Sequence, residues 1–287
     1  MKIGIQTNLF DVQGYGRWGE NAYKKLKEHG FSCSDYSMAN TDTLIYTASE
    51  EEADAILLHE KELAFQAGIE IVQVHGPWRY PPKDSTEDDR KERMEKMKKS
   101  IRAAALLECK NWVIHPIMPY GMQDINTEYA KKTWELNIEF MRELLDEAKK
   151  YDITICFENM PMHEFSLAKP ADILRFVKEI NDEHFKICLD TGHVSVFEDL
   201  VIGDEVRRLG DEIRVLHVHD NKMGKDLHLM PRFGDIDWCD FSKALKDINF
   251  AGCFSLETIP SRKLSDDIFE QMCKLLLKIS EEIIYGI

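Results

Sequence analysis

The sequence lacks the features typical of secreted, membrane-spanning or thiolate-metal proteins. It has no basic-then-apolar leader with a small-residue cleavage site, and no apolar run long enough to span a bilayer. Its seven cysteines are odd in number and never spaced as CxxC, and Cys156, Cys188 and Cys253 fall inside apolar runs, where cysteine acts as a small apolar filler. We therefore expect a cytoplasmic protein without disulfides, a thiolate metal site or a membrane partner.

Phosphate-binding loops and excess positive charge are also missing. No glycine-rich loop of the GxGxxG or GxxxxGK[ST] type follows an apolar run, so the sequence predicts no nucleotide cofactor. The chain has 37 Lys and Arg against 52 Asp and Glu, a formal net charge of -15. Its basic clusters, such as Lys131/Lys132 and Arg207/Arg208, lie in expected helices that also carry glutamates. An acidic surface repels nucleic-acid phosphates, and we expect no nucleic-acid partner.

Short β-branched runs alternate with longer helical patterns along the whole chain. We expect strands at 3–7, 31–36, 69–75, 111–115, 153–158, 185–190, 213–217 and 252–257. We expect helices at 18–29, 50–67, 86–108, 127–151, 170–180, 205–209, 241–248 and 265–285. Because each helix supplies a crossover between parallel strands, this alternation predicts an α/β fold: a single-domain (β/α)8 TIM barrel over residues 1–287. An open doubly wound sheet is the alternative, and it would leave the first and last strands apart.

Acidic and imidazole residues end most of the expected strands. In chain order they are His75, His115, Glu158, Asp190 with His193, His217 with His219 and Asp220, and Glu257, while Asp226 and His228 fall in an expected loop. In a TIM barrel the reactive groups lie at the carboxyl ends of the strands, so these side chains are expected to converge. Carboxylates mixed with histidines bind divalent metals, and the sequence therefore predicts a metal-centred enzyme pocket.

Seven motifs in a fixed order carry a family resemblance. HGP, IHP, FEN, DTGH, HVHDN, DLHLMPRFGDIDW and SLET follow one another along nearly the whole chain. Together they resemble the xylose isomerase-like TIM-barrel superfamily, in particular its sugar phosphate isomerase/epimerase branch. The chain departs from the family in one loop, where Pro231-Arg232-Phe233-Gly234 stands in place of the usual Pro-Gly.

The resemblance implies an isomerase or epimerase of carbohydrate metabolism that acts on a small-molecule sugar or sugar phosphate. In that branch one divalent metal ion (Mn, Zn, Mg or Co) is held by four ligands, which correspond here to Glu158, Asp190, His217 and Glu257. The two glutamates also form the catalytic acid/base pair, which moves a proton through an enediolate. His193 corresponds to a residue that contacts substrate oxygens. Hydride shift is a second route to isomerisation that the sequence does not separate from proton transfer.

Further substrate contacts are predicted with an open alternative for each. His75 and His115 end strands and either line the pocket or are satisfied core histidines. Trp78 offers an aromatic face to a sugar or packs in the core, as does Trp238. Arg232 is a candidate phosphate or carboxylate clamp or an ordinary exposed arginine.

The loop residues Asp226 and His228 admit three interpretations: a second metal site, a substrate contact or a solvated turn. We favour a substrate contact, without excluding the other two. Homo-oligomerisation through aromatic loops at the barrel mouth stays open.

A neighbouring branch of the superfamily provides the main alternative function. Apurinic endonucleases with a trinuclear zinc site share much of the pattern, and all nine residue types of their ligand set are present. They correspond to His75, His115, Glu158, Asp190, His193, His217, Asp226, His228 and Glu257. A related sugar dehydratase or lyase and a noncatalytic sugar-binding protein are further alternatives.

Overall fold

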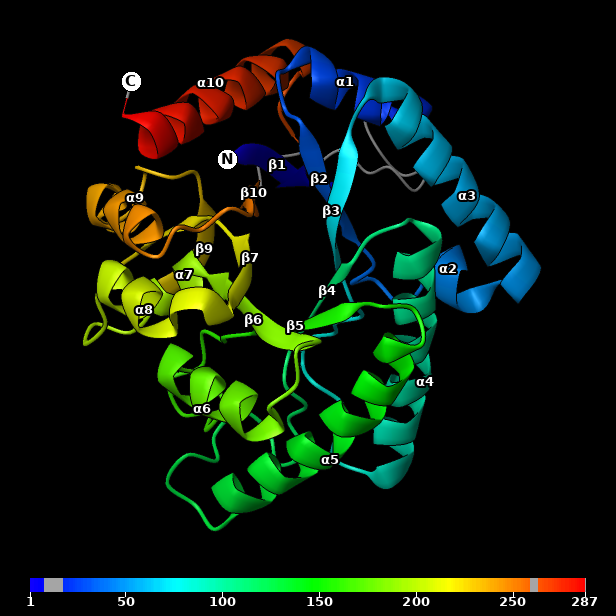
Figure 1. The fold of residues 1–287 in the computed structure, drawn as a ribbon, viewed down its shortest axis with the longest axis vertical. Helices are drawn as coiled ribbons and strands as arrows, with labels where there is room; N and C mark the ends of the chain where they lie inside the picture. Colours follow the sequence, from blue (N-terminus) through cyan, green and yellow to red (C-terminus); the bar gives the residue numbers. More distant parts are fainter. Residues whose placement is uncertain (8–17, 259–262, 287) are drawn as a thin grey trace.

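The computed structural model describes residues 1–7, 18–258 and 263–286, in which a ring of parallel strands is surrounded by helices (Figure 1). The eight strands of the main sheet are β1 (Lys2–Gln6), β2 (Cys33–Ser37), β3 (Glu70–His75), β4 (Asn111–Ile114), β5 (Thr154–Glu158), β6 (Phe185–Asp190), β7 (Ile213–His217) and β10 (Cys253–Leu256). Each lies within three residues of its expected position. The predicted α/β TIM-barrel architecture is therefore confirmed, and the open doubly wound alternative is wrong.

The two ends of the sheet meet at a seam between β7 and β10. The strand order is β10-β1-β2-β3-β4-β5-β6-β7, with β10 parallel to β1. Just beyond β7, Val218 N donates to Ser255 O at 2.8 Å, and Glu257 N donates to Val218 O at 2.9 Å. These hydrogen bonds join the seam at the carboxyl end of the barrel, where the candidate side chains lie.

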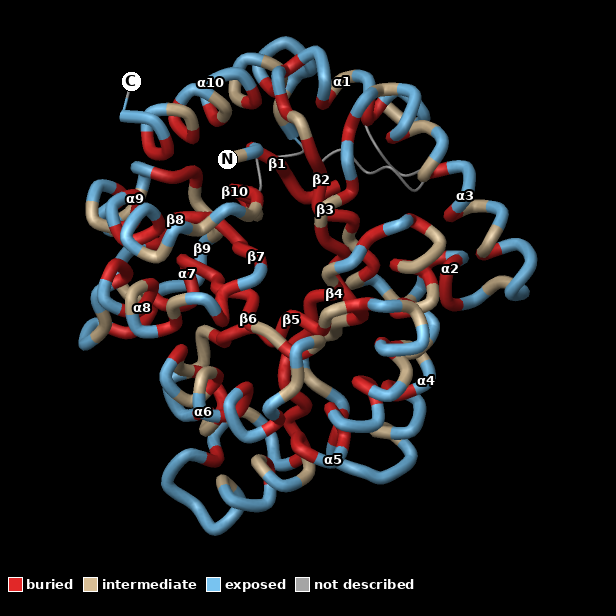
Figure 2. The backbone as a smooth tube through the Cα atoms, viewed as in Figure 1, coloured by how far each residue is buried: buried red, intermediate tan, exposed pale blue. Residues whose placement is uncertain are grey.

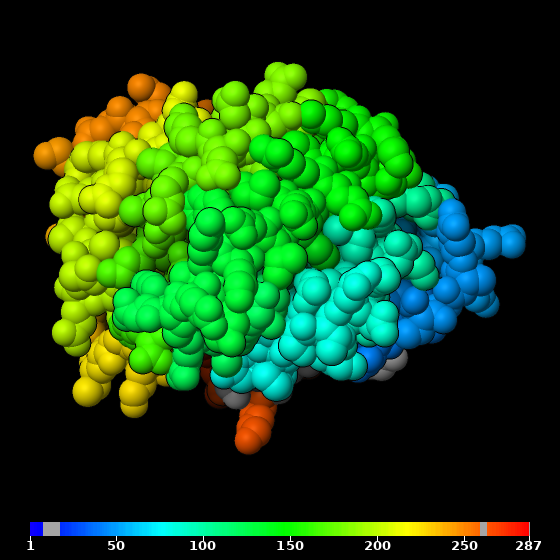
Figure 3. Space-filling view, turned by 90° about the horizontal axis from the view of Figure 1, so that it is seen from below, coloured from blue at the N-terminus to red at the C-terminus, as the bar shows by residue number. Residues whose placement is uncertain are grey.

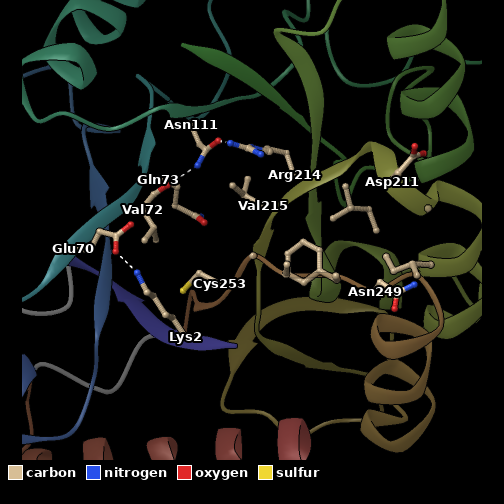
Figure 4. Close-up of a pocket in the computed structure, with 16 residues that line it drawn as sticks. Lys2, Glu70, Val72, Gln73, Asn111, Asp211, Arg214, Val215, Asn249 and Cys253 are labelled. Atoms are coloured by element: carbon tan, nitrogen blue, oxygen red, sulfur yellow. Dashed lines mark hydrogen bonds and ion pairs between the residues drawn. The ribbon is translucent and has the colours of Figure 1, made fainter. Parts of the chain in front are cut away.

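The amino end of the same seam is open. A cavity of about 500 Å³ lies there, lined by Ile213, Arg214 and Val215 of β7 and by the segment 248–253 before and at the start of β10 (Figure 4). Its rim holds an ion pair between Lys2 and Glu70. This cavity therefore lies at the opposite end of the barrel from the seam's hydrogen bonds.

Helices cover the outside of the barrel. They are η2 (Gly19–Asn21), α1 (Ala22–Glu28), α2 (Leu44–Thr47), α3 (Glu50–Ala67), α4 (Glu87–Leu106), α5 (Tyr129–Lys149), α6 (Pro170–Ile180), α7 (Thr191–Ser195), α8 (Ile202–Leu209), η3 (Gly210–Glu212), α9 (Trp238–Asp247) and α10 (Asp266–Tyr285). Figure 2 shows buried strands inside a ring of helices with exposed outer faces, and in Figure 3 the teal and green segments that include α4 and α5 cover one flank. No helix among the described residues is long and apolar enough to cross a membrane.

Local capping explains where several helices begin and end. Ser49 and Glu52 form a reciprocal capping box at the start of α3, and Gly68 ends that helix with a φ of 68°. The helix α9 begins three residues earlier than expected because the Asp237 side chain accepts hydrogen bonds from Cys239 N and Asp240 N.

Several short elements among the described residues were not predicted, including two helices and two strands. The helices α2 and α7 are each shorter than two turns. The strands β8 (Asp220–Lys222) and β9 (Lys225–Leu229) form an antiparallel hairpin, so the prediction that Asp226 and His228 lie in a loop is wrong. The hairpin turns at Met223 and Gly224, which both have positive φ, as a two-residue type I′ turn requires.

The barrel interior is filled by small side chains from neighbouring strands. Val113, Cys156, Cys188 and Val215 form one buried cluster, supplied in turn by β4, β5, β6 and β7. Cys156 and Cys188 thus pack as the apolar fillers that the sequence predicts. This compact plug sits beneath the strand ends and fixes the floor of the site.

Candidate metal centre

Four side chains from four strands converge at the carboxyl end of the barrel. Glu158 ends β5, Asp190 ends β6, His217 ends β7, and Glu257 follows β10 directly. One nitrogen or oxygen atom of each lies within 4.8 Å of the corresponding atoms of the other three. Glu158, Asp190 and His217 are buried, whereas the Glu257 side chain is 13% exposed. The arrangement is a small acidic cup, open on the side of Glu257.

The imidazole of His217 occupies the centre of this cup. Its Nδ1 lies 3.1 Å from Glu158 Oε1 and 3.2 Å from Glu257 Oε2, and its Nε2 lies 3.0 Å from Asp35 Oδ2. Burial opposes a charge on this ring, but its neighbours outweigh that effect and raise the pKa of His217 well above its usual value. These neighbours are Cys188 and the surrounding carboxylates, and burial raises the pKa of Cys188 as well. A nitrogen that faces two carboxylates needs a cation between them, either a proton or a metal ion.

A second group lies beside the first and involves the unexpected hairpin. His193, His219, Asp226 and His228 also offer ligand atoms within 4.8 Å of one another. Asp226 Oδ2 lies 3.6 Å from His193 Nε2 and 3.5 Å from His228 Nε2. The rings of His219 and His228 stack at 4.0 Å. His228 has a φ of 47°, a left-handed conformation that is unusual for a side chain inside a strand.

A third group forms around the other oxygen of Glu158. His115 Nε2 lies 3.1 Å and His75 Nε2 3.8 Å from Glu158 Oε2. Both histidines are buried. Trp78 packs edge-on against the His115 ring, with centroids 4.4 Å apart, so its indole borders this group.

The hydrogen bonds of the histidines fit a divalent cation. His75, His193 and His228 each donate Nδ1–H to a backbone carbonyl, at 2.7 to 2.9 Å, and turn Nε2 toward a carboxylate. Metal-binding histidines characteristically use one nitrogen in this way and keep the other for the metal. The mixture of imidazole and carboxylate donors suits zinc, manganese and similar ions.

Burial disfavours charge throughout the pocket, and the groups also shift one another's pKa values. Burial opposes a charge on His193, but nearby carboxylates, Asp190 foremost, raise its pKa to about 10. Burial likewise opposes a charge on His228, and Asp226 raises its pKa to about 9. For His115 burial dominates and lowers the pKa to about 4. The carboxylates therefore favour a positive charge on His193 and His228, whereas burial favours neutral His115.

Two candidate residues lie away from these groups. Trp238 is 4% exposed, donates Nε1–H to Asp220 Oδ2 at 2.8 Å and packs against Phe241, so it is a core residue rather than an exposed sugar platform. The guanidinium of Arg232 lies 3.9 Å from Glu282 of α10. Its role as an anion clamp stays a prediction.

Sequence reasoning missed two side chains that hold the cup together, Gln6 and Asp35. Gln6 Nε2 donates to Glu257 Oε1 at 2.9 Å. His219, which the sequence did single out, lies with its Nε2 3.0 Å from Asp190 Oδ1. Asp35 contacts His217 from the middle of β2. The only signal for Asp35 in the sequence is a carboxylate inside an expected strand, since it does not stand at a strand end.

The chain belongs to the Xylose isomerase-like TIM barrel family, whose model matches residues 23–278. It is similar to a D-psicose 3-epimerase from Enterocloster bolteae, with 25% identity over 259 residues that cover 90% of this chain and 82% of the relative. Among solved structures it is similar to a D-tagatose 3-epimerase-like protein, with a TM-score of 0.76, 25% identity and coverage of 100% and 99% of the two chains. The IOLI protein with a bound zinc atom has a TM-score of 0.77 at 17% identity, covering 100% and 99%, which is a likeness of fold alone.

Proposed function

We propose that the protein is a divalent-metal-dependent sugar epimerase or isomerase, with epimerisation of a ketose as the first activity to test. The observation that carries this proposal is the convergence of Glu158, Asp190, His217 and Glu257 from four separate strands. The similarity to a D-psicose 3-epimerase across 90% of the chain supports the substrate class. An assay of free and phosphorylated ketoses distinguishes the two forms of the substrate.

These four side chains would hold the cation, and His193 would contact the substrate. When bound, a divalent ion supplies Lewis-acid stabilisation of the negative charge that develops on the substrate's carbonyl and neighbouring oxygen atoms. His75, His115, Asp226, His228 and Trp78 lie in or against the two adjoining groups and are proposed to line the sugar.

Glu158 and Glu257 would act as the acid/base pair. Both approach His217 Nδ1, but they arrive from β5 and from the end of β10. Glu257 is held by Gln6, and Glu158 by His115 and His217. One carboxylate removes the proton beside the substrate carbonyl, and the other returns a proton to the opposite face of the resulting enediolate, which inverts that carbon.

The test is an assay of free and phosphorylated ketoses with Mn²⁺ in D₂O. Epimerisation by proton transfer introduces solvent deuterium at the inverted carbon. E158Q and E257Q should each lower kcat by at least about 100-fold, since general acid–base catalysis contributes about 10²–10⁴. E143Q, in the exposed α5 pair with Lys98, is the control. Activity that survives exhaustive chelation, or unchanged turnover in E257Q, would contradict the proposal.

One observation favours the apurinic endonuclease as a second candidate. The three groups together contain all nine residues that correspond to the trinuclear ligand set, gathered at one end of the barrel. About three zinc ions per chain and cleavage of abasic duplex DNA would support it. A metal content near one ion per chain, with no cleavage, would favour the sugar enzyme. A dehydratase, lyase or binding protein would show metal binding without epimerised product.

A further inference from the structure

We propose that Asp35 is a positioning residue for His217, orienting its ring so that Nδ1 faces the acidic cup and thereby strengthening divalent-cation binding. The inference rests on the proposed metal-dependent function, but it concerns a residue outside the four candidate ligands. Asp35 lies in the middle of β2, two residues from either end of the strand.

The contact crosses the interior of the barrel. Asp35 and His217 are both fully buried, and Asp35 Oδ2 lies 3.0 Å from His217 Nε2. In the sheet order β2 and β7 are not neighbours, so the two side chains meet across the barrel rather than along one ladder. With Nε2–H donated to Asp35, the only other ring nitrogen is directed at Glu158 and Glu257.

Gln73 holds the carboxylate in place from the other side. Its Nε2 donates to Asp35 Oδ2 at 3.0 Å and to Leu216 O at 3.2 Å. Gln73 is fully buried on β3, and its side chain extends toward Val215 of β7 beside the cavity at the open end of the seam (Figure 4). The Asp35 carboxylate is therefore held between the Gln73 amide and the His217 imidazole.

The charge of Asp35 requires a cationic partner, and His217 is placed to provide it. A buried carboxylate is costly unless it is paired. Among the described residues, the ion-pair partner of Asp35 within 4.0 Å is His217, and Asp35 Oδ1 has no hydrogen-bond partner. The charge is thus balanced through the imidazole by whatever cation lies at Nδ1. A carboxylate on the far nitrogen of a metal-binding histidine fixes the ring and raises its basicity as a ligand.

The experiment compares Mn²⁺ binding by the full-length wild type and D35N, using isothermal titration at one pH. Loss of such an outer partner typically weakens metal binding about 10–100-fold, and we expect a change of that size. S34A is the matched control, because Ser34 is equally buried on the same strand and its hydroxyl has no described hydrogen-bond partner. A D35N dissociation constant equal to that of the wild type would overturn the inference.

A second readout separates positioning from a merely structural role. D35N removes one partner of the buried pair with His217, so the metal-free protein should melt at a lower temperature. A merely structural role predicts this lower melting temperature with unaltered Mn²⁺ affinity, which would contradict us. If D35N does not fold, Gln73→Met tests the same chain of hydrogen bonds: weaker Mn²⁺ binding supports the inference, and unchanged binding refutes it.

The outcome does not depend on finding the sugar. Weakened Mn²⁺ binding in D35N with no ketose epimerised would retain the role of Asp35 and reject the proposed function. Epimerisation by the wild type with unaltered Mn²⁺ binding in D35N would retain the proposed function and reject the role of Asp35.

Discussion

The imidazole of His219 fills the space that a side chain on Gly192 would need. A Cβ atom at Gly192 would lie 1.9 Å from His219 Cε1, far inside van der Waals contact. His219 in turn lies 3.0 Å from Asp190 Oδ1. The glycine of the DTGH motif therefore allows a histidine to pack against one of the candidate metal ligands.

We predict that G192A displaces His219 and with it Asp190. The steric overlap should destabilise the protein by about 1–3 kcal/mol and weaken Mn²⁺ binding. G203A is a matched control, since its Cβ would meet Asp240 equally closely on the outer helices. Comparison of Mn²⁺ titrations and thermal melts should show weakened binding only in G192A. Equal Mn²⁺ affinity in both variants would contradict the role of His219.

Trp238 is predicted to be structural through its hydrogen bond to Asp220. W238F keeps most of the packing but removes the Nε1–H donor. The buried Asp220 Oδ2 then lacks this hydrogen bond, which should lower the free energy of unfolding by about 1–3 kcal/mol. W134F is the control, because Trp134 donates to Glu179 at an exposed position where water replaces the bond. Urea unfolding of both variants measures the difference. A smaller loss for W238F than for W134F would refute this account.

Glu60 should make stability depend on pH. Burial raises its pKa to about 8, whereas an unfolded chain ionises near 4.3. Between these values the unfolded state loses a proton that the folded state keeps, so this contribution to stability declines as pH rises and levels off above pH 8. E60Q removes the dependence, and its gain over wild type, roughly 1–4 kcal/mol at pH 8.5, should shrink toward pH 5.5.

E62Q on the same helix is the control, because Glu62 is exposed. Urea unfolding from pH 5.5 to 8.5 measures all three proteins. A gain for E60Q that is constant with pH would show that Glu60 does not titrate in this range.

The strand-end residues of the site were predictable because a parallel barrel brings all carboxyl ends of its strands together. That rule places Glu158, Asp190 and His217 without any knowledge of loops. The same rule does not distinguish His217 from His219, since alternate residues of a strand share a face. In the structure His217 faces Glu158 and Glu257, whereas His219 contacts Asp190.

The hairpin and the interior contacts were not predictable in the same way. The strand β8 consists of three polar residues, and β9 offers only Leu227 and Leu229 in alternation, a pattern too short to identify a strand. The contact between Asp35 and His217 depends on which residues of two distant strands face each other across the barrel. That relation follows from the stagger of the closed sheet, which no local pattern records.

Anomalous diffraction from crystals of the protein grown with Mn²⁺ tests the central claim most directly. The account predicts a manganese peak bound by Glu158, Asp190, His217 and Glu257, lost in crystals of E257Q grown in the same way. Well-ordered crystals with no peak among these four side chains, or with manganese only elsewhere, would contradict it.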